Sequence, residues 1–204
     1  ALWDILGQAT GQPVGRLLGG RFRERVQPYA SLLMDEPERL SDTLHRIKAE
    51  GFRAFKIGWG PFGRRDAATD RAIVAAARAA VDAGGSDAYW RNGYNWALRT
   101  ARMLAEYDVY WFEEALNPDH LEDFVKLREH SPVPIAGGEV LTRRQAFLPW
   151  IERGAFDIIQ PDVTKVGGIS EERRIAWWAE EHGIRFIPHG WNTADRVRRA
   201  EYFY

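Results

Sequence analysis

Five polar residues each follow a short apolar run of the chain. They are Lys56, Glu113, Glu139, Asp162 and His189. The last four stand 26, 23 and 27 residues apart, counting from 113 to 139, from 139 to 162 and from 162 to 189. Because this interval suits one strand–helix unit, the five side chains are expected to leave equivalent strand ends and to converge on one face. Carboxylates, a lysine and a histidine gathered in this way can bind a metal and move protons.

The carboxylates among them indicate a magnesium site. Glu113 and Glu139 leave successive strands, and they repel each other unless a cation lies between them. An oxygen-rich donor set in a chain with 0 cysteines suits Mg²⁺, or Mn²⁺, better than Zn²⁺. The strand before Glu113 must supply a third ligand, and two candidates remain open. Asp87 keeps the spacing even, 26 residues before Glu113, whereas Asp82 follows a valine, as an Asp leaving a strand should.

Asp162 and His189 form a second candidate pair on successive units. A carboxylate that hydrogen-bonds one ring nitrogen fixes the tautomer of an imidazole and raises its pKa, so the ring becomes a competent general base or acid. Lys56 leaves an earlier strand, on the other side of the expected metal. A lysine there can exchange protons or hold a negatively charged substrate.

The elements that must position these residues alternate along the chain. Apolar runs predict strands at Val26–Ala30, Ala54–Trp59, Val109–Phe112, Val133–Ala136, Phe156–Ile159 and Arg185–Ile187. Amphipathic segments between them predict helices at Pro37–Glu50, Ala67–Val81, Trp96–Glu106, Leu121–Glu129, Arg143–Arg153 and Ile169–His182. This alternation indicates an α/β fold with a parallel sheet, and units of about 25 to 30 residues suit a TIM-like barrel. An open doubly wound sheet would need a Gly-rich phosphate turn after its first strand, which the sequence lacks.

Three stretches depart from the repeating pattern. Residues 82–87, DAGGSD, follow a predicted helix directly and contain no apolar run, so the third strand of the barrel is doubtful. The chain after Thr193 is rich in arginine where an eighth strand is needed. Residues 1–20 form a predicted helix with a Gly-rich stop. We therefore expect an incomplete barrel domain over residues 21–204, preceded by a helical segment.

Composition excludes several classes of protein. The 204 residues carry 28 Lys plus Arg against 29 Asp plus Glu, a net charge of −1, which argues against a nucleic-acid partner. The absence of cysteine excludes disulfides, thiolate zinc sites and cysteine nucleophiles. No apolar run approaches the roughly 20 residues of a membrane span, and no signal-peptide pattern opens the chain. We therefore expect no membrane partner and a cytoplasmic location.

Six segments together resemble the barrel domain of the enolase superfamily, in its mandelate racemase group. They are ALWDILGQATGQPVGRLLGG, GFRAFKIGWG, YWFEEALNPD, VPIAGGEVLTRR, FDIIQPDVTKVGGISE and IPHGWNT, in the family's order and spacing. The resemblance implies a (β/α)7β barrel, a small carboxylate substrate and a homo-oligomer. It also implies Mg²⁺ held by Glu113, Glu139 and either Asp82 or Asp87.

The same resemblance implies a proton-transfer dyad of Asp162 and His189. A carboxylate at position 162 separates this group from the muconate-lactonizing group, which has a lysine there. The family's K-x-K pair is Lys56-Ile57-Gly58 here, so the second lysine is absent. The usual N-terminal capping domain is largely missing from the sequence, apart from residues 1–20.

The predicted reaction starts with removal of a proton α to the carboxylate of a sugar acid. Mg²⁺ on that carboxylate stabilises the resulting enediolate, and Lys56 adds positive charge. Departure of a β-hydroxyl as water then gives a 2-keto-3-deoxy acid. Because Gly58 removes the base expected opposite the dyad, we favour this dehydratase over a racemase or epimerase that uses Lys56 as its second base. A truncated, catalytically inactive paralogue is the third hypothesis.

Overall fold

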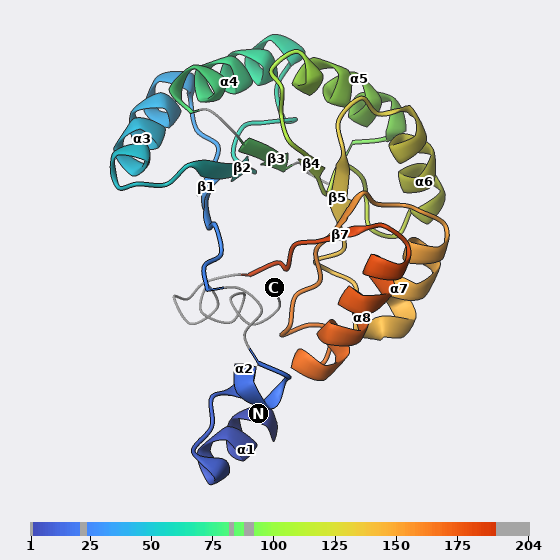
Figure 1. Ribbon diagram of the computed structural model, residues 1–204. Coiled ribbons are helices and arrows are strands. Elements are labelled where there is room, and N and C mark those ends of the chain that lie inside the picture. Colours follow the sequence, from blue (N-terminus) through green and yellow to red (C-terminus); the bar gives the residue numbers. More distant parts are fainter. Residues whose placement is uncertain (1, 21–23, 82–83, 88–91, 191–204) are drawn as a thin grey trace.

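A computed structural model of the chain describes residues 2–20, 24–81, 84–87 and 92–190. Within these residues, seven parallel strands form one sheet in chain order, each paired with the next. The strands are β1 (Tyr29–Leu33), β2 (Ala54–Gly58), β3 (Gly84–Asp87), β4 (Phe112–Glu113), β5 (Ile135–Gly137), β6 (Ile158–Ile159) and β7 (Arg185–Phe186). The sheet curves into an arc with the helices that link its strands along the outer side (Figure 1). The predicted TIM-like α/β fold with parallel strands is therefore confirmed.

Six helices alternate with these strands. They are α3 (Pro37–Ala49), α4 (Ala67–Ala80), α5 (Tyr94–Ala105), α6 (Leu121–His130), α7 (Arg143–Glu152) and α8 (Ile169–Glu181). Local chemistry sets their starts: Pro37 opens α3, where its missing N–H loses no helical hydrogen bond. Asp66 caps α4 by accepting a hydrogen bond from the Thr69 backbone N–H at 2.8 Å. Among the described residues, no helix is both long and apolar enough to cross a membrane.

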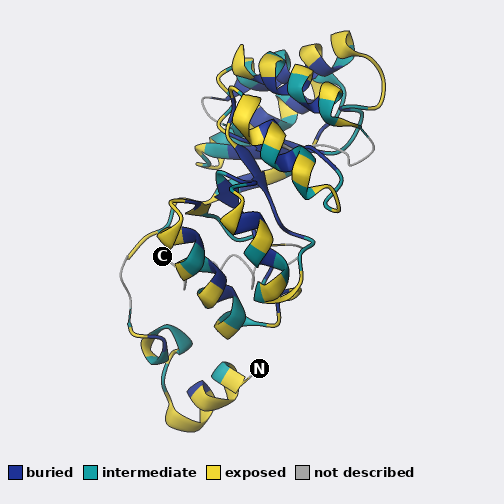
Figure 2. Cartoon of the chain, turned by 90° about the vertical axis from the view of Figure 1, so that its right-hand side faces the viewer, coloured by how far each residue is buried: buried dark blue, intermediate teal, exposed yellow. Residues whose placement is uncertain are grey.

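Side chains of the strands alternate between two apolar cores, as the period of a strand requires. Outward residues such as Phe55 and Phe112 join a large apolar layer between the sheet and the helices. Inward residues Trp111, Ala136 and Ile158 form a smaller cluster inside the arc. Figure 2 shows the buried residues concentrated on the sheet and on the helix faces turned toward it. The polar strand-end residues therefore lie at one end of an apolar barrel interior.

The third strand, doubtful from the sequence, is present as β3. It pairs in parallel with both β2 and β4. Its glycines explain the missing apolar signal, because a Cβ added at Gly85 would lie 2.5 Å from the ring of Trp111, the residue just before β4. The indole fills the space that a side chain of β3 would otherwise take. The doubt about this strand was therefore wrong: β3 is present, and the apolar group packed at Gly85 is the side chain of Trp111.

Replacing Gly85 by alanine should destabilise the fold, because the added methyl group must displace the buried indole of Trp111. Overpacking of this kind costs about 1–3 kcal/mol. Urea unfolding followed by circular dichroism should give a lower midpoint for G85A. Gly93→Ala is the matched control, because its added Cβ meets no atom within 4 Å, and it should lower the midpoint less. Equal midpoints for G85A and the native chain would contradict this packing.

The other predicted strands are present with shifted bounds. β1 begins at Tyr29 rather than at Val26. Pro28 explains the shift, because proline has no N–H to donate to a strand ladder. The strands from β4 to β7 are shorter than predicted, and in β4, β5 and β6 the paired residues begin in the second half of the apolar run, at Phe112, Ile135 and Ile158.

The two ends of the chain differ in what the structure shows of them. Residues 1–20, predicted as one helix, hold two: α1 (Leu2–Thr10) and α2 (Val14–Leu17), which lie below the arc in Figure 1. The indole Nε1 of Trp3 in α1 donates a hydrogen bond to Ser170 Oγ in α8 at 2.8 Å. The region after Thr193, where an eighth strand is needed and was doubtful from the sequence, falls outside the described residues.

Candidate active site

Four of the five predicted side chains lie at or just after the carboxyl ends of their strands, and Lys56 lies in the middle of β2. Lys56 is in β2 and Glu113 ends β4, while Glu139, Asp162 and His189 follow β5, β6 and β7. Their side chains are only 1–11% exposed. Contacts join them into two groups, one of Lys56 with Glu113 and one of His189 with its two carboxylates. The structure thus brings Lys56 to Glu113, and His189 to Asp162 and Glu139.

Glu113 is held by a charged partner and by neutral ones. Lys56 Nζ lies 2.5 Å from its Oε1 atom. Trp111 Nε1 donates to Oε2 at 2.8 Å, and Gln160 Nε2 donates to the same oxygen at 3.0 Å. A buried carboxylate needs such partners, because an unpaired charge out of water is very unfavourable. The arrangement keeps Glu113 stable as a buried anion.

His189 links two carboxylates. Its Nδ1 atom lies 2.8 Å from Asp162 Oδ2, and its Nε2 atom lies 3.0 Å from Glu139 Oε2. The backbone fixes this geometry, since residues 162 and 189 form a parallel β-bridge and the His189 N–H donates to Pro161 O at 3.0 Å. With Nδ1 as donor to Asp162, Nε2 is the ring atom left to exchange a proton, and it faces the Glu139 carboxylate. The ring is therefore placed as a general base or acid.

Asp162 is itself held by Thr164. The backbone N–H and the hydroxyl of Thr164 donate to Asp162 Oδ1 at 2.7 and 2.5 Å. Burial acts to raise the pKa of Asp162, but the hydrogen bonds from Thr164 and His189 outweigh it and hold that pKa below its ordinary value. Asp162 thus stays ionised at neutral pH. Its stabilising effect is present above the ordinary carboxyl pKa and is lost as the pH falls through the lowered value.

Three residues of this network were missed from the sequence. Trp111 and Gln160 each stand two positions before a predicted residue, Glu113 and Asp162. Strand alternation puts residues two apart on the same face, and that was the available signal. Thr164 follows Asp162 by two positions, and at this spacing an Asp side chain commonly accepts a hydrogen bond from the backbone N–H of the later residue. A contact across the barrel, such as that of Gln160 with Glu113, has no local signal.

Two further buried carboxyl groups lie beside the site. Glu114 Oε1 accepts a hydrogen bond from the Gly138 N–H at 2.8 Å, yet burial, reinforced by the nearby Glu139 carboxylate, raises the pKa of Glu114 to about 8. Burial, and then the Asp162 carboxylate, raise the pKa of Glu172 in α8 to about 8. Both groups are therefore mainly protonated at neutral pH and add little negative charge.

Glu172 should make folding less favourable as the pH rises. Its pKa increases on folding from 4.5 to about 8, so its stabilising contribution is fully present below about pH 4.5 and is lost as the pH rises through about 8. We expect Glu172→Gln, which stays neutral, to lose less stability between about pH 6 and 9 than the native chain, by a difference on the order of a few kcal/mol. Melting curves across this range measure it, with Glu180→Gln on the exposed face of α8 as control. An identical pH dependence for E172Q and the native chain would contradict the burial argument.

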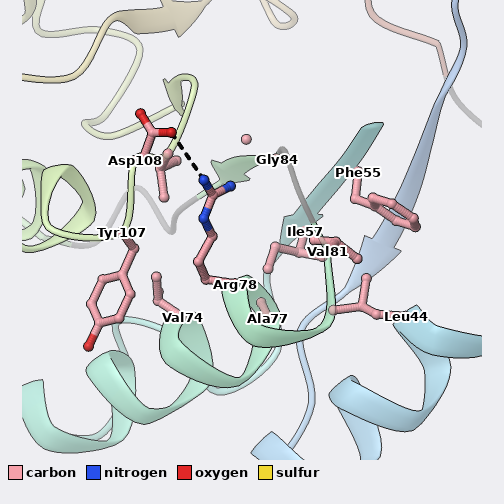
Figure 3. A pocket seen from close by; sticks show the side chains of 12 residues that line it. Leu44, Phe55, Ile57, Val74, Ala77, Arg78, Val81, Gly84, Tyr107 and Asp108 are labelled. Atoms are coloured by element: carbon pink, nitrogen blue, oxygen red, sulfur yellow. Dashed lines mark hydrogen bonds and ion pairs between the residues drawn. The ribbon is translucent and has the colours of Figure 1, made fainter. Parts of the chain in front are cut away.

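A separate pocket lies at the other end of the strands. Figure 3 shows apolar side chains from α3, β2 and α4 lining it, together with Arg78, which pairs with Asp108 at 3.0 Å. Gly84, the first residue of β3, also lines it, so the pocket is at the amino ends of the strands. In a barrel of this type, that end serves stability rather than catalysis. The candidate site is the opposite end.

Strand register bears on the third metal ligand. Asp87 ends β3 and stands directly opposite Glu113 in the parallel pairing of β3 with β4. Asp82, the other candidate, falls outside the described residues. Within the described side chains, no group of three His, Cys, Asp or Glu is placed to hold a metal ion. The described carboxylates at this end therefore supply at most part of a ligand set.

Comparison with known proteins agrees with the geometry. Residues 39–200 match the family described as enolase C-terminal domain-like. The chain belongs to this family. The enolase-type barrel resemblance drawn from its motifs is therefore confirmed.

Two curated relatives of this enolase-type barrel act on sugar-acid compounds by name. The D-galactarolactone cycloisomerase of Agrobacterium fabrum (strain C58) is 37% identical over 214 residues, covering 100% of this chain and 55% of the relative. The D-galactonate dehydratase of Variovorax paradoxus (strain S110) is 34% identical over 197 residues, covering 93% of this chain and 52% of the relative. The chain thus spans about half the length of the curated relatives it matches.

Solved structures with the same enolase-type barrel superpose closely on the chain. The 3,6-anhydro-D-galactonate cycloisomerase of Zobellia galactanivorans superposes with a TM-score of 0.91 at 31% identity, over 99% of this chain and 57% of that one. A mandelate racemase/muconate lactonizing protein of Paracoccus denitrificans PD1222, complexed with magnesium, gives a TM-score of 0.86 at 30% identity, over 93% of this chain and 53% of that one.

Proposed function

We propose that the chain carries the catalytic barrel of a Mg²⁺-dependent acid-sugar enzyme that removes a proton α to a carboxylate. One observation carries the proposal: the His189 ring lies between Asp162 and Glu139 at the barrel mouth, at 2.8 and 3.0 Å. A base oriented by one carboxylate beside a second carboxylate suited to a cation is the arrangement that metal-assisted proton abstraction needs.

The residues fit Mg²⁺ by the chemistry of their donors. Glu113 and Glu139 offer carboxylate oxygens only, the ligands that Mg²⁺ prefers. Each of these carboxylates lies beside a basic side chain, Glu113 beside Lys56 and Glu139 beside His189. We propose Asp87 as the third ligand because of its register with Glu113. Mn²⁺ suits the same oxygen set.

Each remaining role follows from position. When bound, Mg²⁺ would supply a Lewis acid that stabilises an enediolate. Asp162 holds the His189 tautomer, so Nε2 takes the α proton or returns a proton to a leaving hydroxide. Lys56, whose Nζ lies beside Glu113, binds the substrate carboxylate. Because its raised pKa keeps Glu114 mainly neutral, this residue adds little negative charge beside Glu113 and Glu139.

Dehydration is the outcome that we favour. The end of β2 has Gly58 where the family has its second lysine, so His189 is the base on one face of the substrate and Lys56 is the remaining basic group of β2. The named D-galactonate dehydratase among the relatives supports loss of a β-hydroxyl as water. The 37% identity to a cycloisomerase favours isomerisation as the second candidate, as a racemase or epimerase by the same enolisation.

The test is turnover in D₂O with Mg²⁺ and a panel of sugar acids, followed by NMR. A dehydratase gives a 2-keto-3-deoxy product, whereas an epimerase or racemase gives an α-deuterated substrate of changed configuration. Either signal should disappear on chelation of the metal. No product and no deuterium exchange with any acid would contradict the proposal and favour an inactive paralogue.

A further inference from the structure

The Oε2 atom of Glu113 is held from two directions by different elements. Trp111, two residues before Glu113 and just outside β4, donates through its indole at 2.8 Å. Gln160, which follows β6 two strands away, donates through its amide at 3.0 Å. One hydrogen bond would let the carboxylate rotate about it, whereas two donors from separate segments of the chain fix its orientation. The other oxygen, Oε1, is thereby left for a cationic partner, here Lys56 Nζ.

Both of these donors are uncharged. A neutral N–H stabilises a carboxylate without cancelling its charge, so the anion keeps its attraction for a divalent cation. We propose that Trp111 and Gln160 are positioning residues for the metal: they anchor Oε2 of Glu113 and so fix the direction of Oε1, the oxygen that Lys56 Nζ contacts and that the cation would share. This inference rests on the proposed function, because it assigns how one ligand of that site is oriented.

The indole of Trp111 is locked in place by its surroundings. It is 6% exposed and makes edge-to-face contacts with Tyr29 and Tyr110, at centroid distances of 5.7 and 5.6 Å. Gly85 on β3 leaves the space that the ring occupies. A ring packed in this way cannot follow the carboxylate if it moves. Its N–H therefore defines where Glu113 Oε2 must lie.

Packing alone does not account for an amide at position 160. Gln160 is 1% exposed and its backbone N–H donates to Gly137 O at 2.8 Å. Its side-chain Oε1 has no hydrogen-bond partner among the described residues. Burying an unpaired amide oxygen is unfavourable, and an apolar side chain of similar length would avoid that loss. The donation from Nε2 to Glu113 is the contact that explains the amide.

Metal binding without substrate tests the inference. Gln160→Met and Trp111→Phe each remove the donor to Glu113 Oε2 and put an apolar side chain in its place. The probe is Mn²⁺, titrated into the chain and followed by electron paramagnetic resonance of the free ion. Loss of such an outer hydrogen bond weakens metal binding by about 10–100-fold. We expect a loss in this range for each variant.

The matched control is Trp150→Phe, which removes a buried indole that stacks on Phe156 in the other core. It should leave the Mn²⁺ affinity unchanged even if it lowers the melting temperature. Native Mn²⁺ affinity in folded Q160M and W111F would overturn the inference and leave the proposed function standing. No Mn²⁺ binding by the native chain would overturn both. Because the two variants act independently, failure of one to fold leaves the other as the test.

Discussion

Replacing His189 by asparagine is expected to lower the rate of α-proton removal by at least about 10²–10⁴-fold, the usual contribution of a general base or acid. Asparagine can still donate a hydrogen bond to Asp162, so the local structure should survive. It cannot take up a proton at neutral pH, so the step that starts the reaction loses its base. Deuterium incorporation at the α carbon in D₂O, followed by NMR, measures this step directly.

His182→Asn is the control for this variant. His182 caps the C-terminal end of α8 on the exposed surface, where its ring contacts the backbone carbonyl of Trp178 at 2.9 Å. Exchange by H182N should match that of the native chain. If H189N exchanged the α proton at the native rate, His189 would not be the base, and Lys56 would become the candidate.

The second large effect is expected from Glu139→Gln. This change keeps the shape of the side chain but removes the charge that faces both His189 Nε2, at 3.0 Å, and the proposed cation. Losing one of the few anionic ligands of a divalent cation should weaken Mg²⁺ binding by at least about 100-fold, more than the loss of an outer hydrogen bond. Initial rates measured against Mg²⁺ concentration should therefore need far more metal to saturate.

An exposed glutamate provides the comparison. Glu129→Gln, on the solvent side of α6, removes the same charge far from the strand ends and should leave the Mg²⁺ dependence unchanged. A native Mg²⁺ dependence in folded E139Q would remove Glu139 from the ligand set. The proposed metal site could not then be built on β4 and β5.

Much of this fold was predictable because its signals are local. Each apolar run predicted a strand, and the first polar residue after it predicted a position at the barrel mouth, as for Glu113 and His189. β3 was not predictable in this way, because Gly85 has no side chain to give an apolar signal. The ring of Trp111 fills the space that such a side chain would take. The start of β1 was predictable too, because Pro28 cannot donate to a strand ladder, but the prediction followed the apolar pattern and placed the start at Val26.

The site was predictable as a set of residues and less so as a network. Spacing placed Asp162 and His189 one unit apart, and the structure gives them a hydrogen bond of 2.8 Å. The anchoring of Glu113 by Gln160 depends on the distance across the barrel, which spacing does not contain. Burial likewise sets the protonation of Glu172, a helix residue that the sequence alone presents as an ordinary surface acid.

The third ligand shows how register adds to spacing. The sequence left two candidates for this ligand. The even spacing favoured Asp87, whereas the preceding valine favoured Asp82. Parallel pairing puts Asp87 opposite Glu113, which is why we propose it as the ligand.

The most direct test of the account is the anomalous diffraction of crystals of the chain grown with Mn²⁺, measured near the manganese absorption edge. We expect one anomalous peak at the carboxyl ends of the strands, within bonding distance of Glu113 Oε1, of Glu139 and of the Asp87 carboxylate. A peak bonded to Asp82 instead would move only the third ligand. The absence of a peak there, or a peak whose ligands include neither Glu113 nor Glu139, would contradict the central claim that these strand ends form a cation site for proton abstraction.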